Sequence, residues 1–137
     1  MRLLFLVPMY YIYSGSNALD LYTTGSGRIR DKITYNLKFG EQTVFPSAIW
    51  YFLDNGNGTF KIVNLKYRKF LFCGLNNKLA VNDKNFDNDN QVWSADIYGR
   101  NLLNKLCNVY LGISTSGITN GMPALSTKPY TLRLILA

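Results

Sequence analysis

The feature that most constrains this chain is a repeat that recurs three times along it, with a period of roughly forty residues. A bulky side chain closes each unit, at Trp50, Trp93 and Leu132. Earlier in each unit, two apolar positions lie eight residues apart: Tyr11 and Leu19, Val63 and Leu71, and Leu103 and Leu111. A fixed period of this length is typical of repeat architectures, so we expect three similar units, each of about four short strands.

The composition is that of one folded domain with a basic surface. The 137 residues are enough to bury a core of their own. Apolar residues make up 47% of the chain and aromatic residues 15%, which excludes a disordered segment. The net charge of +7 makes an anionic partner worth considering, but surplus lysine that only keeps the protein soluble is the favoured interpretation.

The local patterns are those of short β-strands. Apolar and polar residues alternate over residues 59–63 and again over residues 130–136, as they do in half-buried strands. Turn residues are dense between such runs, and pairs such as Asn120-Gly121 supply the positive φ angles of tight turns. No long stretch keeps a helical period, so we expect an all-β fold, either a sandwich or a closed barrel.

Cysteine and histidine usage limits the chemistry. The chain has two cysteines, Cys73 and Cys107, both inside apolar strand-like runs, and no histidine. We expect two free, buried cysteines that pack as small apolar side chains, with one disulfide as the alternative. Histidine is the commonest general base and the commonest metal ligand. We therefore expect no enzymatic activity, no metal site and no cofactor.

The N-terminus begins like a signal peptide but does not continue like one. Met1 and Arg2 precede an apolar run, which Pro8 interrupts, and tyrosines stand where a small-residue cleavage site would follow. The run is too short to span a membrane. We interpret residues 1–7 as a first strand. The protein is then secreted or released without an ordinary cleaved signal peptide, or else it is cytoplasmic.

The closing residues of the units carry a recognisable motif. Gln91-Val92-Trp93 is an intact Gln-x-Trp preceded by Asn90, whereas the first unit keeps only Trp50 and the third has lost the motif. Three units that close in this way resemble a β-trefoil, and within that fold the ricin-type (ricin B-like) lectin family. The resemblance implies that Asn90, Gln91, Trp93 and Trp50 form a structural motif. It also implies a single trefoil domain over residues 1–137, pseudo-threefold, with units at 1–56, 57–98 and 99–137.

The same alignment predicts the core. The six aligned apolar positions are Leu19, Trp50, Leu71, Trp93, Leu111 and Leu132. Burial of a side chain of this size stabilises a fold by roughly 1.5–3 kcal/mol, so we expect these positions to be structural. The first unit is the longest, and we place its extra residues between positions 25 and 46.

The resemblance also implies where a sugar would bind. In ricin-type lectins a repeat can hold a sugar with an Asp after the second strand, an aromatic ring that stacks on the sugar, and an Asn or Gln. The matching residues here are Asp20, Tyr35 and Asn36, with Phe39 and Tyr22 as further stacking rings. A carboxylate makes charge-assisted hydrogen bonds, and an aromatic ring offers rigid apolar area.

The other two units lack this set. Phe72 and Gly112 stand where the family has its Asp, so at most one family-type sugar site survives. An alternative role for Asp20 is that of an ordinary turn or strand-end carboxylate bonded to backbone N–H groups. Tyr35 has the alternative of being part of the barrel core.

Two groups of basic residues offer a second kind of site. The basic patch of the second unit consists of Lys61, Lys66, Arg68 and Lys69, and a second group lies at Arg28, Arg30, Lys32 and Lys38. Such groups bind sulfated glycans or acidic lipid headgroups; nucleic acid is not favoured. Simple solvation is the favoured interpretation of these groups. An acidic loop at Asp83, Asp87 and Asp89 is interpreted as solvated rather than as a Ca²⁺ site.

Three functional classes follow. The first is a non-catalytic, carbohydrate-binding lectin that recognises cell-surface glycans, with galactose-type sugars as the expected class. The segments 5–8, 14–16 and 60–64, together with Trp50, resemble the small haemagglutinin component of botulinum toxin complexes. That resemblance implies a second class, a toxin accessory protein that acts as an adaptor for companion subunits. The third class is a protease inhibitor with residues 25–46 as its reactive loop.

Overall fold

The computed structural model describes residues 8–41, 45–83, 85, 89–96 and 98–137. The expected first strand at residues 1–7 lies outside the described residues. The first unit contains β1 (Met9–Ser14), β2 (Asn17–Thr24), β3 (Thr34–Glu41) and β4 (Trp50–Asp54). The second contains β5 (Phe60–Asn64), β6 (Phe70–Cys73), β7 (Leu79–Asn82) and β8 (Trp93–Ala95). The third contains β9 (Leu102–Asn104), β10 (Val109–Ile113), β11 (Pro123–Ser126) and β12 (Arg133–Leu136).

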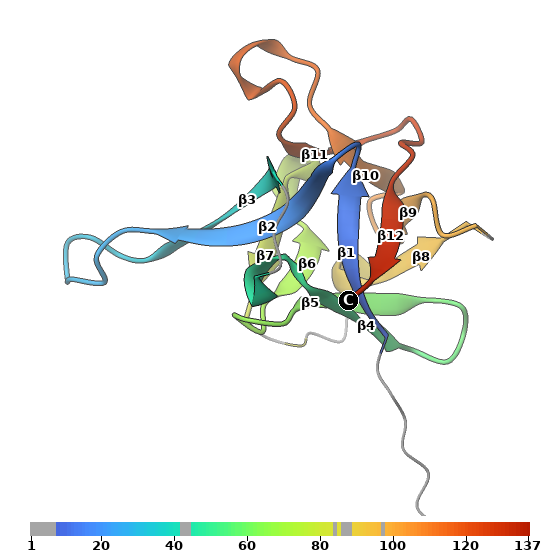
Figure 1. Ribbon diagram of the computed structural model, residues 1–137, viewed down its shortest axis with the longest axis horizontal. Coiled ribbons are helices and arrows are strands. Elements are labelled where there is room, and N and C mark those ends of the chain that lie inside the picture. The colour runs from blue at the N-terminus through green and yellow to red at the C-terminus, as the bar shows by residue number, and fades with distance from the viewer. Residues whose placement is uncertain (1–7, 42–44, 84, 86–88, 97) are drawn as a thin grey trace, which may run out of the picture.

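The only helical segments in the described residues are single 3-10 turns: η1 (Pro46–Ala48), η2 (Leu75–Asn77), η3 (Asp89–Gln91) and η4 (Gly117–Thr119). The unit boundaries expected from the sequence fall in the loops between β4 and β5 and between β8 and β9. The extra length of the first unit forms a long hairpin, because β2 and β3 pair over all eight of their residues. In Figure 1 this hairpin projects to the left of the barrel.

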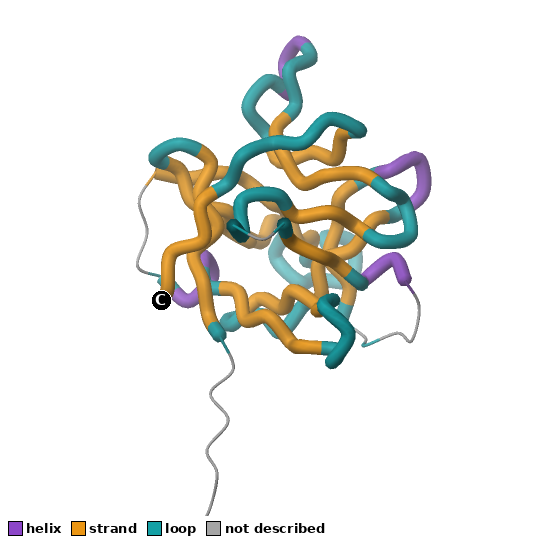
Figure 2. The backbone as a smooth tube through the Cα atoms, turned by 90° about the vertical axis from the view of Figure 1, so that its right-hand side faces the viewer, coloured by secondary structure: helices purple, strands orange, loops and turns teal. Residues whose placement is uncertain are grey.

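Six strands form a barrel and the other six form three hairpins. The antiparallel barrel pairs are β12–β1, β1–β4, β4–β5, β5–β8 and β8–β9, and the hairpins are β2–β3, β6–β7 and β10–β11. Figure 2 shows the strands wrapped around a common centre, with the short helical turns on the outside. This arrangement is a β-trefoil, and the expected all-β class is confirmed.

The core contains all six residues that the repeat predicted. Trp50 lies against Leu19 and donates a 3.0 Å hydrogen bond from its indole Nε1 to the Leu19 carbonyl oxygen. Trp93 makes the same 3.0 Å bond to the carbonyl oxygen of Leu71. A buried indole N–H needs such a partner, because leaving it unpaired costs free energy. Each bond therefore ties a barrel strand to the hairpin of its own unit.

Two buried asparagines, which the sequence analysis did not single out, repeat a second link. Asn64 at the end of β5 donates from Nδ2 to the Ser47 carbonyl oxygen at 2.8 Å. Asn104 at the end of β9 donates in the same way to the Asn90 carbonyl oxygen at 2.9 Å. Ser47 and Asn90 each lie three residues before a closing tryptophan. Side-chain amides thus join the start of one unit to the end of the unit before it.

The cysteines are bonded to each other, so the expectation of free cysteines is wrong. Cys73 at the end of β6 and Cys107 in the turn after β9 form a disulfide with a Cα–Cα distance of 6.5 Å. The two residues are 34 positions apart in sequence and belong to different units. Only the packing of the second hairpin against the third unit brings them together.

Replacing Trp93 with alanine should destabilise the protein by roughly 3–5 kcal/mol, as other large-to-small core changes do. The variant leaves a cavity and removes the donor to Leu71. Chemical unfolding followed by circular dichroism measures the effect. Ser94→Ala, on the half-buried neighbour in β8, is the control and should stay within about 0.5 kcal/mol of the wild type. A Trp93→Ala unfolding midpoint at the wild-type value would contradict the core assignment.

The double variant Cys73→Ala, Cys107→Ala should lose about 4 kcal/mol of stability, the value expected for opening a loop of this length. A reducing agent should lower the melting temperature of the wild type toward that of the variant and leave the variant unchanged. Equal melting temperatures of oxidised and reduced wild type would show that the bond does not form.

Candidate functional site

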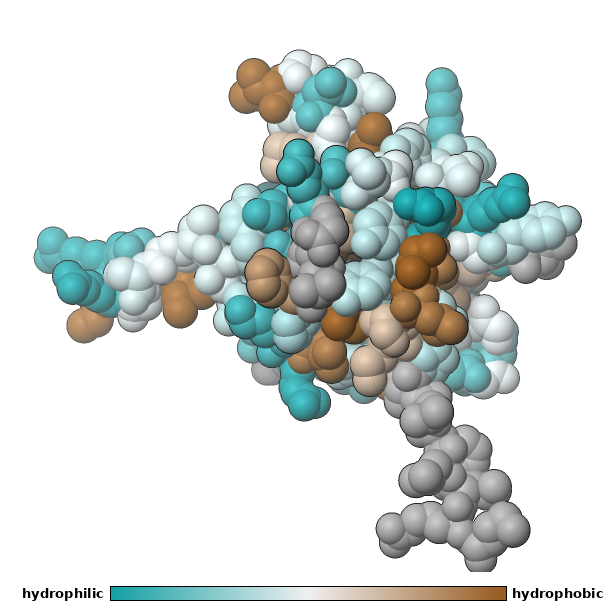
Figure 3. Space-filling view, in the orientation of Figure 1, coloured by the Kyte–Doolittle hydropathy of each residue, from teal (hydrophilic) through white to brown (hydrophobic). Residues whose placement is uncertain are grey.

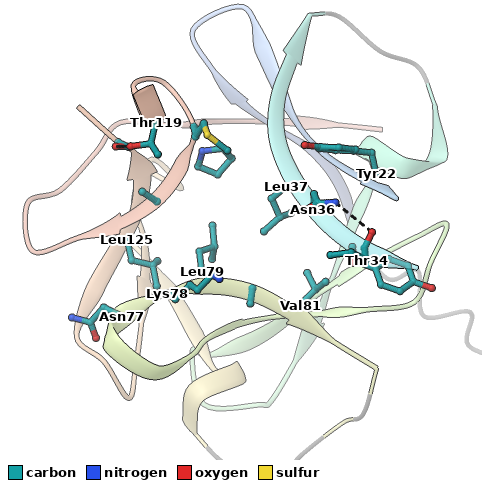
Figure 4. Close-up of a pocket in the computed structure, with 16 residues that line it drawn as sticks. Tyr22, Thr34, Asn36, Leu37, Asn77, Lys78, Leu79, Val81, Thr119 and Leu125 are labelled. Atoms are coloured by element: carbon teal, nitrogen blue, oxygen red, sulfur yellow. Dashed lines mark hydrogen bonds between the residues drawn. The ribbon is translucent and has the colours of Figure 1, made fainter. Parts of the chain in front are cut away.

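The three hairpins surround an axial pocket of about 490 Å³ at one end of the barrel (Figure 4). Leu37 of β3, Leu79 of β7 and Leu125 of β11 point toward its middle, one from each hairpin. These leucines are half-buried and pack against the hydrophobic core. The apolar floor of the pocket is therefore a continuation of the core, left open to solvent at the pseudo-threefold axis.

Polar side chains form the rim of the axial pocket. Tyr22 and Asn36 come from the first hairpin, Asn77 and Lys78 from the second, and Thr119 from the third. Among the described lining residues Lys78 carries the only charge. Small-molecule sites commonly combine an apolar floor with a few polar groups that fix orientation.

The polar side chains of the rim are held by hydrogen bonds. Asn36 donates from Nδ2 to the hydroxyl oxygen of Thr24 at 3.1 Å. The hydroxyl groups of Ser114 and Thr119 are hydrogen-bonded at 2.8 Å. Thr119 also donates from its hydroxyl to the Ser116 carbonyl oxygen at 2.7 Å. This part of the rim is preorganised, which lowers the entropic cost of binding a ligand.

The register of β2 and β3 divides the predicted sugar-binding residues between two faces. Asp20 pairs with Lys38, and Tyr22 pairs with Asn36. Directly paired residues of antiparallel strands share a face, and so do residues two apart along one strand. Asp20 and Asn36 therefore lie on one face of the hairpin, together with Tyr22 and Lys38.

Tyr35 and Phe39 lie on the opposite face. Phe39 pairs with the buried Leu19, and Tyr35 pairs with Thr23 further toward the turn. Phe39 is half-buried and packs against the core. The hairpin thus brings together Asp20 with Asn36, and Tyr35 with Phe39, but it does not bring all four to one surface.

Asp20 is placed differently from the family pattern. It lies in the middle of β2, is half-buried, and is not among the residues that line the axial pocket. Its Oδ1 atom is buried and has no hydrogen-bond partner within the described part of the chain. A sugar hydroxyl cannot reach an atom that solvent does not reach unless the neighbouring groups move. The Oδ1 atom of Asp20 is therefore closed to a sugar hydroxyl in this conformation, and Asp20 lies outside the axial pocket.

Tyr35 borders the axial pocket and is in contact with the second unit. Its ring meets the ring of Tyr67 edge-on, with centroids 5.5 Å apart. The Lys69 ammonium group lies 4.4 Å from the centroid of the Tyr35 ring and 3.8 Å from a carboxylate oxygen of Asp83. Tyr35 is thus held between Tyr67 and the Lys69 cation, which fixes its ring at the border of the pocket.

The basic patch predicted in the second unit is divided among different partners. Lys61 donates a hydrogen bond to the side-chain oxygen of Asn85 and lines a separate hollow beside the β4–β5 turn. Lys66 lies over the ring of Tyr67, and Arg68 is exposed in the β5–β6 turn with a positive φ of 55°. Lys69 is paired with Asp83. Because their partners differ, the four residues of the basic patch do not form one continuous cationic surface.

The acidic loop is only partly described. Asp83 pairs with Lys69, and Asp89 pairs with Lys105 at 3.8 Å, whereas Asp87 lies outside the described residues. In the part of the chain that the structure describes, no three potential metal-ligating side chains gather. No helix there is long and apolar enough to cross a membrane.

The Gln-x-Trp residues lie in the interior. Gln91 is fully buried and donates from Nε2 to the side-chain oxygen of Asn82 at 2.6 Å. Asn90 accepts the bond from Asn104 through its backbone carbonyl. Both residues connect η3 to neighbouring strands, so their contacts are those of a structural motif.

The segment expected to act as a reactive loop, residues 25–46, includes a long strand and a closed turn. Residues 34–41 form β3, and the exposed turn between β2 and β3 is closed by a 2.9 Å bond from the Gly27 N–H to the Asp31 carbonyl oxygen. A reactive loop has to enter a protease cleft in extended form. A closed turn fits that role less well than the sequence indicated.

No protein-family model matches the sequence, and no curated protein matches it. Solved structures do match its fold. A designed three-fold symmetric protein, ThreeFoil, superposes with a TM-score of 0.70 at 17% identity, covering 93% of this chain and 97% of that chain. SeviL bound to the asialo-GM1 saccharide has a TM-score of 0.63 at 20% identity, covering 96% and 99%.

The Polyporus squamosus lectin, bound to a sialylated human-type influenza-binding epitope, has a TM-score of 0.65 at 12% identity. The match covers 92% of this chain and 48% of that chain. At such low identities the similarity establishes a shared fold. The structural neighbours thus include lectins of the β-trefoil class, which agrees with the ricin-type resemblance at the level of the fold.

The sequence analysis missed most of the axial pocket. Leu37, Leu79 and Leu125 stand at different distances from the closing residues of their units, so the repeat does not align them. Lys78 and Thr119 belong to turns that share no motif. No signal in the sequence marks these residues as neighbours.

Proposed function

We propose that this protein is a non-catalytic carbohydrate-binding module and that the axial pocket is its glycan site. The observation that carries the proposal is the composition of the pocket, an apolar floor within a rim of tyrosine, amide and hydroxyl groups. Sugars present the same combination, an apolar ring face surrounded by hydroxyl groups. The fold that this chain shares with lectins solved in complex with saccharides supports the proposal.

Each part of the pocket has a role in this proposal. The sugar packs its apolar face against Leu79, and its hydroxyl groups bond to Asn36 and Thr119. Galactose-type sugars remain the expected class. Lys78 adds a preference for glycans that carry sialic acid or sulfate, because an ammonium group forms a charge-assisted bond with an anion.

A glycan array followed by titration calorimetry tests this proposal. Asn36→Ala should weaken binding of the best glycan by about tenfold, the effect of losing one or two hydrogen bonds. Lys78→Ala should reduce binding of anionic glycans more than that of neutral ones. Asn57→Ala, in the β4–β5 turn away from the pocket, is the matched control and should bind like the wild type.

Asp20→Asn distinguishes the axial pocket from a family-type site. The substitution keeps the shape of the side chain and removes its charge. Unchanged affinity is expected for the axial pocket, whereas loss of binding in this variant would place the site at Asp20. A wild-type protein that binds no glycan on the array would refute the function.

An open strand edge favours the adaptor as a second candidate function. The Leu132 N–H donates to the Arg100 carbonyl oxygen at 2.7 Å, and the described residues of β9 and β12 form no ladder beyond it. The Ala137 N–H bonds to Met9 of β1, so by alternation the backbone groups of Leu134 and Leu136 face away from β1. An edge of this kind is a template for pairing with another chain.

The surroundings of that edge also suit a protein partner. A cleft of about 610 Å³ lies beside β12, with Tyr98 and Arg100 along the other side. Ile135 and Leu136 are exposed, and Figure 3 shows apolar side chains gathered over β12. An extended segment of a companion subunit, such as a toxin-complex component, would add to the sheet here.

Hydrogen exchange tests whether the edge is open. The amide hydrogen of Leu134 should exchange with solvent much faster than that of Ile135, because the Ile135 amide faces β1 and is protected by that strand. Equal protection of the two amides would show that the edge is covered in the free protein and would remove the support for an adaptor. If the edge is open, peptides can be selected that bind the wild type but not the Leu134→Pro variant. Their sequences identify what the edge accepts.

The disulfide bears on where the protein works. Disulfides persist in oxidising compartments and are rare in the cytosol. The Cys73–Cys107 bond therefore supports the proposal that the protein is secreted or released, rather than cytoplasmic.

A further inference from the structure

Each of the three hairpins presents an aliphatic side chain to solvent at its turn. Ile29 is 96% exposed between β2 and β3, Leu75 is 91% exposed between β6 and β7, and Ile118 is fully exposed between β10 and β11. Single exposed aliphatic residues are common on proteins, but turns ordinarily carry polar residues. An exposed aliphatic side chain at the same place in all three units is a pattern that solubility does not explain.

Hydrogen bonds hold each of these turns in shape. At the first, the Asp31 N–H bonds to the Arg28 carbonyl oxygen at 2.9 Å, which leaves Ile29 at the apex. At the second, the Lys78 N–H bonds to the carbonyl oxygen of Leu75 itself at 3.2 Å. Ile118 lies in η4, which the bond from the Thr119 N–H to the Ser116 carbonyl oxygen closes at 3.1 Å. The aliphatic side chains are therefore displayed by defined turns.

The three hairpins border the same end of the barrel. Asn77 and Lys78 of the second turn and Ser114 and Thr119 of the third border the axial pocket, as does Thr34 at the start of β3. We call this surface the hairpin face. In Figure 1 the β2–β3 turn extends to the left of the barrel and the β10–β11 turn extends above it, so both turns reach beyond the barrel.

The charge on the hairpin face is basic. Arg28 and Arg30 flank Ile29, and Lys32 follows in the same exposed turn. Figure 3 shows hydrophilic side chains gathered at that end of the hairpin. The one carboxylate of the turn, Asp31, accepts a 2.8 Å bond from the Ser26 N–H and so serves the turn itself.

We infer that the hairpin face docks on a membrane surface that contains acidic phospholipids. Ile29, Leu75 and Ile118 insert at the level of the headgroups, while Arg28 and its basic neighbours contact the lipid phosphates. Apolar insertion combined with attraction to anionic lipid is the general mode of peripheral membrane binding. This inference is independent of glycan binding.

The distribution of the side chains favours lipid over a protein partner on this face. A protein interface buries a continuous apolar centre within a polar rim. Here the aliphatic groups are separated from one another, each on its own turn, and polar and basic residues lie between them. A fluid headgroup layer can accept separate insertions of this kind.

Vesicle co-sedimentation tests the inference with lipids that carry no sugar. The wild type should bind vesicles of phosphatidylcholine mixed with phosphatidylserine and bind phosphatidylcholine alone much more weakly. The triple variant Ile29→Ser, Leu75→Ser, Ile118→Ser should bind the mixed vesicles at least about tenfold more weakly, because three aliphatic insertions are lost. It should also lose the rise in surface pressure that the wild type produces in a monolayer of the same lipids.

A matched control uses aliphatic residues exposed elsewhere. Leu106 lies in the β9–β10 turn and Leu136 on β12, and both are largely exposed. The double variant Leu106→Ser, Leu136→Ser should bind vesicles like the wild type. The variant Arg28→Ser, Arg30→Ser should lose the preference for phosphatidylserine while keeping its melting temperature.

Three results would overturn the inference. The first is a wild type that does not bind the mixed vesicles. The second is binding that the triple variant retains and salt removes, which would be adsorption of a basic protein only. The third is an equal loss in the control variant. Because no glycan is present, a failure here leaves the glycan site untouched, and failure of the glycan array leaves this inference untouched.

Discussion

The contact on which the rest of the structure depends is the packing of each closing residue against the hairpin of its own unit. Trp50 and Trp93 fill the space between barrel and hairpin, and their indole N–H groups donate hydrogen bonds to backbone carbonyl oxygens of the hairpins. Leu132 fills the equivalent place in the third unit, but its side chain has no hydrogen-bond donor. Because this contact holds the hairpins at fixed positions, the surface between them is defined as well.

That contact explains the division between structural and functional residues. The fully buried positions are used for the core and for the links between units, as with Gln91 and Asn64. The hairpins are anchored at their inner ends and free at their turns. Residues available for binding therefore lie on the hairpin face and on the open edge of β12, at the periphery of a rigid centre.

The sequence predicted the core well because core positions obey a repeat. Burial demands a bulky apolar side chain at the same place in every unit, so Leu19, Leu71 and Leu111 could be aligned from the sequence. The candidate site could be predicted only in part. Tyr35 and Asn36 are neighbours in sequence and both border the axial pocket, but the alternation of a strand places their side chains on opposite faces.

By itself the sequence determined the all-β class, the three units and the residues at their centre, since these depend on local pattern and on a fixed period. The tertiary structure decided the disulfide, the axial pocket and the open edge of β12. Cys73 and Cys107, like Leu37, Leu79 and Leu125, come from different units, and no local pattern records which units will touch. Contacts between units depend on how the hairpins pack around the axis, and that packing exists only in the folded chain.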